Sequence, residues 1–159
     1  MIDKNINKIL KIVEKALDLL YINEEELFKY DASERSIVFH FGRYFIKFLE
    51  DNKFDLNQYS VDCEYNRTNP NYIKKINNER DILPDLILHK RGDNKDNIMV
   101  IEFKKDSNND SNGRKNDDEK LKYLTSNNGE YRYKMGLLIE LKKDRNNVKI
   151  IKYINGNVQ

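Results

Sequence analysis

Three ionisable residues at the ends of two apolar stretches are the first candidates for chemistry. Asp85 follows Pro84 and begins the stretch DLILHK, whereas Glu102 and Lys104 end the stretch NIMVIEFK. The segment RGDNKDN between the stretches is polar and turn-prone, so the pattern predicts an antiparallel hairpin. In that hairpin, Asp85 is expected to lie across from the Glu102 end of the second strand.

Alternation along a strand places these charges on one face of the expected sheet. Residues i and i+2 share a face, so Glu102 and Lys104 continue the face of Val100. Asp85 shares the face of Ile87. Two neighbouring carboxylates repel each other, and a divalent cation such as Mg²⁺, often held by one or two carboxylates, relieves the repulsion. A nearby lysine can stabilise phosphoryl oxygens or help to orient an attacking water. The three residues therefore predict a site for phosphodiester hydrolysis.

The tripeptide (D/E)-x-K is weak evidence by itself, because it occurs five times in this highly charged chain. Three of the other copies lie at a helix end, in a turn and near a helix start. The copy from Glu140 to Lys142 also ends an apolar strand and is the competing candidate, but it lacks an upstream hairpin strand that opens with Pro-Asp. The alternative explanation for the Glu102 set is a salt bridge at a sheet edge, where charges prevent unwanted strand pairing.

Hydrophobic periodicity predicts helices before and after these strands. Apolar residues at helical spacing indicate one helix over about residues 3–21 and another over about residues 31–50. Asp31 or Ser33 could cap the second helix, and Gly42 weakens it slightly. The other expected elements are strands over 59–67, 85–90, 97–104, 133–143 and 148–156, a mobile loop over 105–118, and a short helix over 117–125. This order predicts one domain over residues 1–159 of the α/β (α+β) class, with a single mixed sheet flanked by helices.

Composition limits the classes of function. The formal net charge is only +2, so binding to a nucleic acid would need a local basic patch. Cys63 is the one cysteine, which excludes an internal disulfide and suits a reducing cytosol, and its alternation with polar neighbours suggests a core position. No apolar stretch approaches the length of a membrane span. These features predict a soluble, cytoplasmic protein without a membrane partner.

Pro84-Asp85, followed on the next strand by Glu102-Phe103-Lys104, resembles the active-site motif of the PD-(D/E)XK nuclease superfamily. That superfamily has the restriction-endonuclease-like fold. The resemblance covers about residues 30–142, and the expected return through a helix to a further strand fits it as well.

The resemblance implies a set of roles. Asp85 and Glu102 would bind Mg²⁺ or Mn²⁺, and Lys104 would be catalytic. Many members carry an acid on the helix before the core sheet, and Glu34 matches it as a further metal ligand. Glu64, on the polar face of the preceding strand, could also reach the site.

The resemblance also implies the class of substrate. Members act mostly on DNA and sometimes on RNA, so a metal-dependent nuclease with DNA as the favoured substrate is expected. Lys120 and Lys122 on the short helix, and Arg67 near the segment NPNYIKK, are candidate contacts to phosphates. A homodimer or a partner protein is a further expectation, by analogy. Because some members have lost catalysis, the alternative is a non-catalytic nucleic-acid-binding or assembly module.

Overall fold

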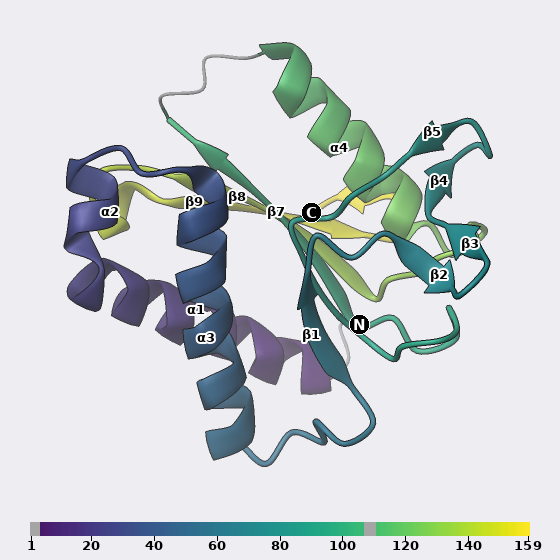
Figure 1. The fold of residues 1–159 in the computed structure, drawn as a ribbon, viewed down its shortest axis with the longest axis horizontal. Helices are drawn as coiled ribbons and strands as arrows, with labels where there is room; N and C mark the ends of the chain where they lie inside the picture. Colours follow the sequence, from purple (N-terminus) through teal and green to yellow (C-terminus); the bar gives the residue numbers. More distant parts are fainter. Residues whose placement is uncertain (1–3, 107–110) are drawn as a thin grey trace.

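The computed structural model describes residues 4–106 and 111–159 and contains a six-stranded mixed sheet with helices on both faces (Figure 1). The helices are α1 (Lys4–Asn23), α2 (Glu25–Lys29), α3 (Glu34–Asp51) and α4 (Ser111–Thr125), with a 3₁₀ turn at Arg145–Asn147. The strands are β1 (Ser60–Cys63), β2 (Arg67–Asn69), β3 (Tyr72–Ile73), β4 (Lys75–Ile76), β5 (Arg80–Asp81), β6 (Leu86–His89), β7 (Met99–Lys105), β8 (Met135–Leu141), β9 (Lys149–Ile154) and β10 (Asn157–Val158). The predicted α+β class with a mixed main sheet is confirmed.

Helices α1 and α3 pack against each other on one face of the sheet. Both repeat apolar residues every three to four positions, and the resulting apolar faces are buried. The Phe41 ring of α3 contacts the Phe103 ring of β7, with 5.1 Å between the ring centroids. The Ser33 side chain caps α3 by accepting a hydrogen bond from the backbone N–H of Ser36 at 3.3 Å. These contacts fix the N-terminus of α3 beside the end of β7.

The longest helix, α1, has 20 residues and is amphipathic rather than uniformly apolar. Among the residues that the structure describes, no helix combines the length and the apolar character needed to cross a membrane.

The main sheet has the strand order β1-β6-β7-β8-β9-β10. Strands β7 and β8 are parallel, and the other neighbours are antiparallel. The parallel connection runs through α4, which covers the face opposite to α1 and α3 (Figure 1). Because helices cover both faces at the centre of the sheet, β8 is buried along its whole length and β7 along most of it. This explains why both strands are apolar on successive residues rather than on alternate ones.

Helix α4 is the largest departure from the elements expected from the sequence. Most of 105–118 is not a loop: Ser111–Thr125 is one continuous helix, although residues 107–110 lie outside the described part. The first two turns of α4 contain no large apolar residue, so hydrophobic periodicity cannot reveal them. Ion pairs attach these turns to the sheet instead, including Arg114 Nη1 to Glu140 Oε1 at 3.4 Å.

The segment between β1 and β6 also differs from expectation. The strand expected over 59–67 stops at the end of β1, because Glu64 takes a left-handed conformation with φ of 49° and turns the chain. Two small hairpins, β2–β3 and β4–β5, follow. The Tyr131 hydroxyl anchors the second hairpin, since it accepts a hydrogen bond from Lys75 N of β4 at 2.7 Å and donates one to Lys75 O at 3.1 Å. The short helix α2 is likewise absent from the sequence-based expectation.

Candidate active site

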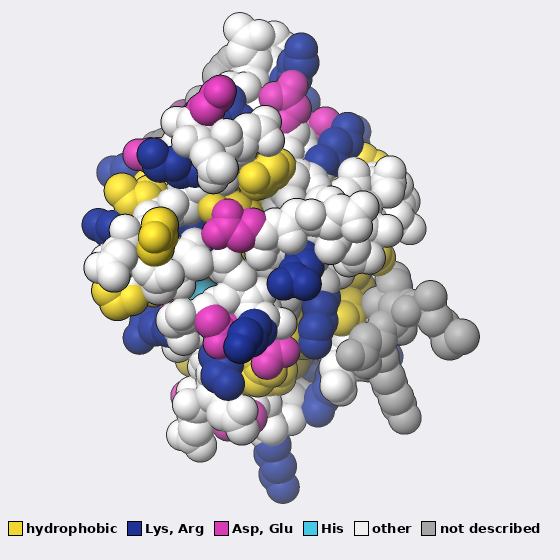
Figure 2. Space-filling view, turned by 90° about the vertical axis from the view of Figure 1, so that its right-hand side faces the viewer, with side chains coloured by type: hydrophobic (Ala, Val, Ile, Leu, Met, Phe, Trp, Pro, Cys, Tyr) yellow, Lys and Arg dark blue, Asp and Glu magenta, His cyan; other side chains and the backbone are white. Residues whose placement is uncertain are grey.

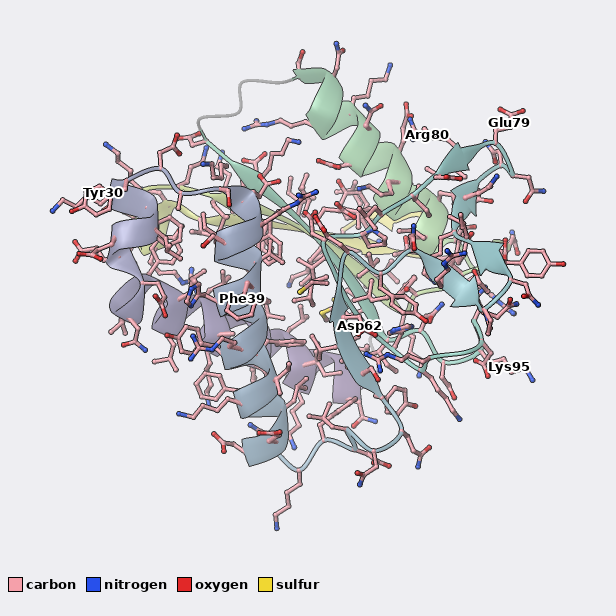
Figure 3. The ribbon with its side chains drawn as sticks, viewed as in Figure 1. Tyr30, Phe39, Asp62, Glu79, Arg80 and Lys95 are labelled. Carbon is pink, nitrogen blue, oxygen red and sulfur yellow. The ribbon has the colours of Figure 1, made fainter. Side chains whose placement is uncertain are left out.

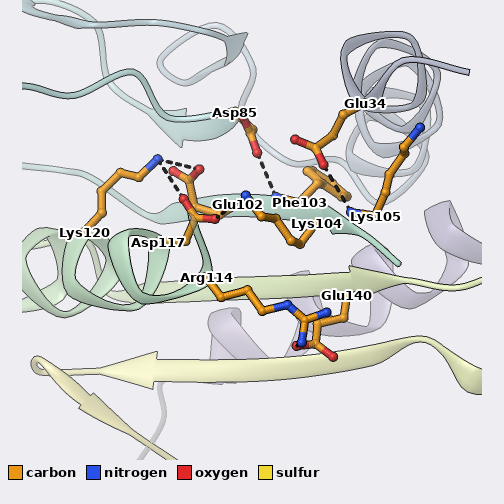
Figure 4. A network of polar contacts seen from close by, with 10 residues as sticks. All are labelled: Glu34, Asp85, Glu102, Phe103, Lys104, Lys105, Arg114, Asp117, Lys120 and Glu140. Carbon is orange, nitrogen blue, oxygen red and sulfur yellow. Dashed lines mark hydrogen bonds and ion pairs between the residues drawn. The ribbon is translucent and has the colours of Figure 1, made fainter. Parts of the chain in front are cut away.

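Asp85, Glu102 and Lys104 lie at one end of the central strands (Figure 4). In the β6–β7 hairpin Leu86 pairs with Ile101, so Asp85, one position earlier, lies across from Glu102. This is the register expected from the sequence. Figure 4 shows the Asp85 and Glu102 carboxylates on the same side of β7, with α4 beside them.

The Asp85 carboxylate is partly buried and is held over β7 by the backbone. Its Oδ2 accepts a hydrogen bond from the backbone N–H of Phe103 at 2.8 Å. The pKa of Asp85 is raised to about 6, chiefly by burial and also by nearby Glu34 and Asp117, whereas the Phe103 hydrogen bond and the Lys120 charge oppose the rise. An acid whose pKa is shifted towards neutrality by burial and by other acids is typical of a functional site.

Glu102 is the most deeply buried acid of the site, with 2% of its surface exposed. Its Oε2 accepts a hydrogen bond from Lys120 Nζ at 2.7 Å. Its Oε1 is buried and has no hydrogen-bond partner among the described residues. Burial first, and then the charge of Asp85, raise the pKa of Glu102 well above its ordinary value. Since buried polar atoms normally have a partner, Oε1 marks a position where a proton or a cation is expected.

Asp117 of α4 joins the two lysines of the site. Lys104 Nζ lies 3.3 Å from Asp117 Oδ2, and Lys120 Nζ lies 3.4 Å from Asp117 Oδ1. Burial by itself would lower the pKa of Lys120, but the charge and hydrogen bond of Glu102 outweigh it and raise the pKa. Three carboxylates, those of Asp85, Glu102 and Asp117, thus face two ammonium groups. The excess of negative charge suits a further cation.

Glu34 and Glu64 line a pocket of about 240 Å³ that Asp85 also lines. Glu34 is the first residue of α3, and its Oε2 accepts a hydrogen bond from the backbone N–H of Lys105 at 3.1 Å. Glu64 Oε1 accepts a hydrogen bond from Arg35 Nε at 2.6 Å, and the backbone N–H of Glu64 donates to Asp85 O at 3.2 Å. Both acids suggested by the sequence therefore stand close to Asp85.

The basic residues that were candidates for phosphate contacts occupy different surroundings. Lys120 is in the cluster, where its side chain is 15% exposed and pairs with Glu102. Lys122, on the same helix, pairs instead with Asp118 at 2.7 Å. Arg67 is exposed at the start of β2, in the small β2–β3 hairpin. Of the three, only Lys120 touches the acids at the end of the central strands.

The competing Glu140–Lys142 motif lies beside the first one. Lys104 and Glu140 are register partners on the parallel strands β7 and β8. The Glu140 carboxylate pairs with Arg114 of α4, whereas Lys142 Nζ pairs with Asp106 Oδ1 at 2.5 Å. Glu140 therefore extends the row of charges on the α4 face, and its lysine has a different partner.

Asp117 and Arg114 are site residues that the sequence did not suggest, because Arg114 falls in the expected loop and Asp117 where that loop meets the expected short helix over 117–125. The sequence contains only a weak signal for the helix that carries them. Asp117 and Lys120 are spaced i, i+3, and Leu121 and Leu124 continue at helical spacing, but four residues of this kind do not define where a helix begins.

Asp85, Glu34 and Glu102 could supply oxygen ligands to a metal ion, but each of them already accepts a hydrogen bond from the protein. In residues 4–106 and 111–159, no group of three or more His, Cys, Asp and Glu side chains is arranged to hold a metal ion. Asp85 is bound by Phe103 N, Glu34 by Lys105 N, and Glu102 by Lys120. The unpartnered Glu102 Oε1 and the excess of carboxylates nevertheless match the hard oxygen ligands that Mg²⁺ prefers.

Comparison with known proteins finds no matching protein-family model, no matching curated protein and no matching solved structure. The site is therefore interpreted from its own geometry.

Proposed function

We propose that the protein is a metal-dependent nuclease that hydrolyses phosphodiester bonds, with DNA as its expected substrate. One observation carries the proposal. The buried Oε1 of Glu102, which has no partner among the described residues, lies across from Asp85 and on the strand face of Lys104. Two carboxylates with an adjacent ammonium group are the components needed to bind a divalent cation and to stabilise charge on a phosphate.

Each residue of the site has a role in this proposal. Asp85 and Glu102 would hold Mg²⁺ or Mn²⁺, with Glu34 as a further ligand. Such a metal supplies a bound water of lowered pKa and neutralises charge on the phosphate. Lys104 would orient the attacking water and stabilise negative charge that develops on the phosphoryl oxygens. Lys120 neutralises Glu102 in the metal-free protein, at a distance of 2.7 Å between Nζ and Oε2.

The order of elements supports assignment to the restriction-endonuclease-like fold. Helix α3, which carries Glu34, precedes the antiparallel strands β1, β6 and β7, and α4 then leads to β8, parallel to β7. The PD-(D/E)XK resemblance implies this helix, strand, helix and strand order. In this assignment the hairpins β2–β3 and β4–β5 are an insertion between the first and second core strands.

The test is cleavage of labelled single- and double-stranded DNA and RNA with Mg²⁺, with Mn²⁺ and with EDTA. We expect metal-dependent cleavage that falls by about 100-fold or more in Lys104→Ala, because positioned proton-transfer and charge-stabilising groups contribute at least that much. Lys142→Ala is the matched control, since Lys142 also stands two residues after a strand-end glutamate, and it should retain wild-type activity. Full metal-dependent cleavage by Asp85→Asn would show that the assignment is wrong.

The second candidate function is a non-catalytic nucleic-acid-binding or assembly module on the same fold. The ion pair between Lys120 and Glu102 favours it, because the chain supplies its own cation to the buried acid. Calorimetry with Mn²⁺ separates the two candidates. Binding that disappears in Asp85→Asn supports the nuclease, and absence of binding by the folded wild-type protein supports the module.

A further inference from the structure

The pocket beside Asp85 has features that the proposed hydrolytic residues do not use. Its volume is about 240 Å³, and it lies between the first turns of α3 and the end of β1. Pockets for drug-sized ligands have volumes of about 300–1,000 Å³. The pocket therefore has room for one ring system next to the site.

One wall of the pocket is apolar and includes an exposed aromatic ring. Val38, Phe39 and Cys63 line it. Phe39 is 60% exposed, although most large apolar side chains of α3 are buried (Figure 3). Cys63, expected in the core, is also exposed, because β1 ends there and the chain turns at Glu64. An exposed phenylalanine gives a flat surface on which another aromatic ring can stack.

The charged wall of the pocket is acidic. Glu34, Glu64 and Asp85 line it, and Arg35, the one cation among the described residues of the lining, is already hydrogen-bonded to Glu64 at 2.6 Å. Such a wall repels a phosphate group. It favours a neutral group that carries N–H donors, because carboxylates accept hydrogen bonds from the amino groups of nucleobases.

We infer that this pocket receives an unpaired, amino-bearing nucleobase next to the scissile phosphate, with its ring on Phe39 and its amino group towards Glu64. The inference rests on the proposed nuclease function for the position of the phosphate, since Asp85 belongs both to the pocket and to the proposed metal site. A base inside a duplex is stacked and paired and cannot enter without being flipped out. The substrate is therefore a single strand or a frayed end rather than an intact duplex.

The test measures binding in EDTA, so that neither metal nor cleavage contributes. Fluorescently labelled oligo-dC, oligo-dT and a duplex of the same length are titrated with wild-type protein, Phe39→Ala and Phe39→Tyr. We expect Phe39→Ala to weaken oligo-dC binding by about 5- to 100-fold, the effect of removing one base-stacking ring. Phe39→Tyr keeps the ring and should bind like the wild type. Duplex binding should not change, and oligo-dC should bind more tightly than oligo-dT.

Each contrary result overturns the inference. Unchanged oligo-dC binding in Phe39→Ala, an equal loss for the duplex, equal affinity for oligo-dC and oligo-dT, or no binding of any oligonucleotide all count against it. Because Phe39 is exposed, the alanine variant should fold, and a urea titration verifies this. Failure of the nuclease proposal is distinguishable: cleavage would then be absent from every substrate while Phe39-dependent binding of oligo-dC persisted. If cleavage depends on Lys104 but Phe39→Ala does not weaken oligo-dC binding, only the inference about the pocket is overturned.

Discussion

The Asp85 carboxylate lies across from the buried Glu102 and near Glu34 and Asp117. In the absence of a bound cation, burial is the largest cause that raises the pKa of Asp85 to about 6, and the charges of Glu34 and Asp117 add to it. The same arrangement that prepares the site for a cation therefore destabilises the metal-free protein at neutral pH.

Because ionised Asp85 destabilises the metal-free protein, we expect Asp85→Asn to increase its free energy of unfolding, and to do so more at high pH than at low pH. The folded-state pKa of Asp85 is higher than its ordinary value, so its favourable contribution is present below about pH 4 and is lost as the pH rises through about 6. At about pH 8 and in EDTA, we expect the variant to unfold with a free energy about 3 kcal/mol larger than that of the wild type. Asparagine retains an oxygen that can accept the Phe103 hydrogen bond.

Urea titrations at about pH 8 and about pH 4.5 check this prediction. The difference between the two proteins should fall to about one third at the lower pH, because pH 4.5 lies below the folded-state pKa of about 6 but still above the ordinary value. Asp81→Asn is the control, because the Asp81 side chain is 62% exposed on β5 and should show little difference at either pH. A stability difference of equal size at both pH values would contradict the prediction.

At the scale of elements, α4 is held close to the sheet through a glycine. A Cβ atom added to Gly136 of β8 would lie 3.0 Å from Thr125 Cγ2 and 3.1 Å from Leu121 Cδ2, both on α4. The close approach of α4 to the sheet matters for the site, because α4 carries Asp117 and Lys120. These side chains form ion pairs with Lys104 and Glu102 of β7. Gly42 of α3 is different, since an added Cβ would make only an ordinary contact of 3.5 Å with Leu86 Cδ1.

Alanine substitutions at these two glycines should therefore have opposite effects. Gly136→Ala overpacks the contact between helix and sheet and should lower the free energy of unfolding by about 1–2 kcal/mol. Gly42→Ala has room and improves helix propensity, so it should raise the free energy of unfolding by about 0.5–1 kcal/mol. Urea titration of both variants is the measurement. Destabilisation by Gly42→Ala would mean that α3 packs more tightly on β6 than the structure shows.

Over the whole molecule, charges of both signs are interspersed. The face in Figure 2 shows lysine and arginine side chains among acidic ones, with no broad basic area. The formal net charge is +2, and the lysines at the site are paired with acids. At the site, a nucleic acid would thus meet lysines that are already paired with acids.

Binding of nucleic acid should consequently depend weakly on salt. For the Lys104→Ala protein, a plot of the logarithm of the affinity for duplex DNA against the logarithm of the salt concentration should have a slope of about −2 to −3. Proteins that contact six to ten phosphates give slopes of about −5 to −9. Fluorescence anisotropy over a range of salt concentrations provides the measurement, and a slope near −8 would reveal an extended basic surface on another face.

The sequence by itself determined the parts that depend on local pattern. Alternation and the polar turn placed Asp85 across from Glu102 and put Lys104 on the same face as Glu102, because side chains in a strand alternate strictly and a hairpin leaves little freedom of register. Helical periodicity and Ser33 likewise indicated α3, whose long apolar face is buried under the sheet. These signals lie within one strand pair or one helix, so the sequence suffices to read them.

Only the tertiary structure decided which groups surround those residues. Asp117 enters the site because α4, without a large apolar residue in its first two turns, is held on the sheet by ion pairs and by the close contact at Gly136. The pocket between α3 and β1 depends on the turn at Glu64 and on where Phe39 emerges from the helix. Contacts between segments far apart in the chain leave no periodic trace in either segment, and the partners of each charge therefore become known only when the elements pack.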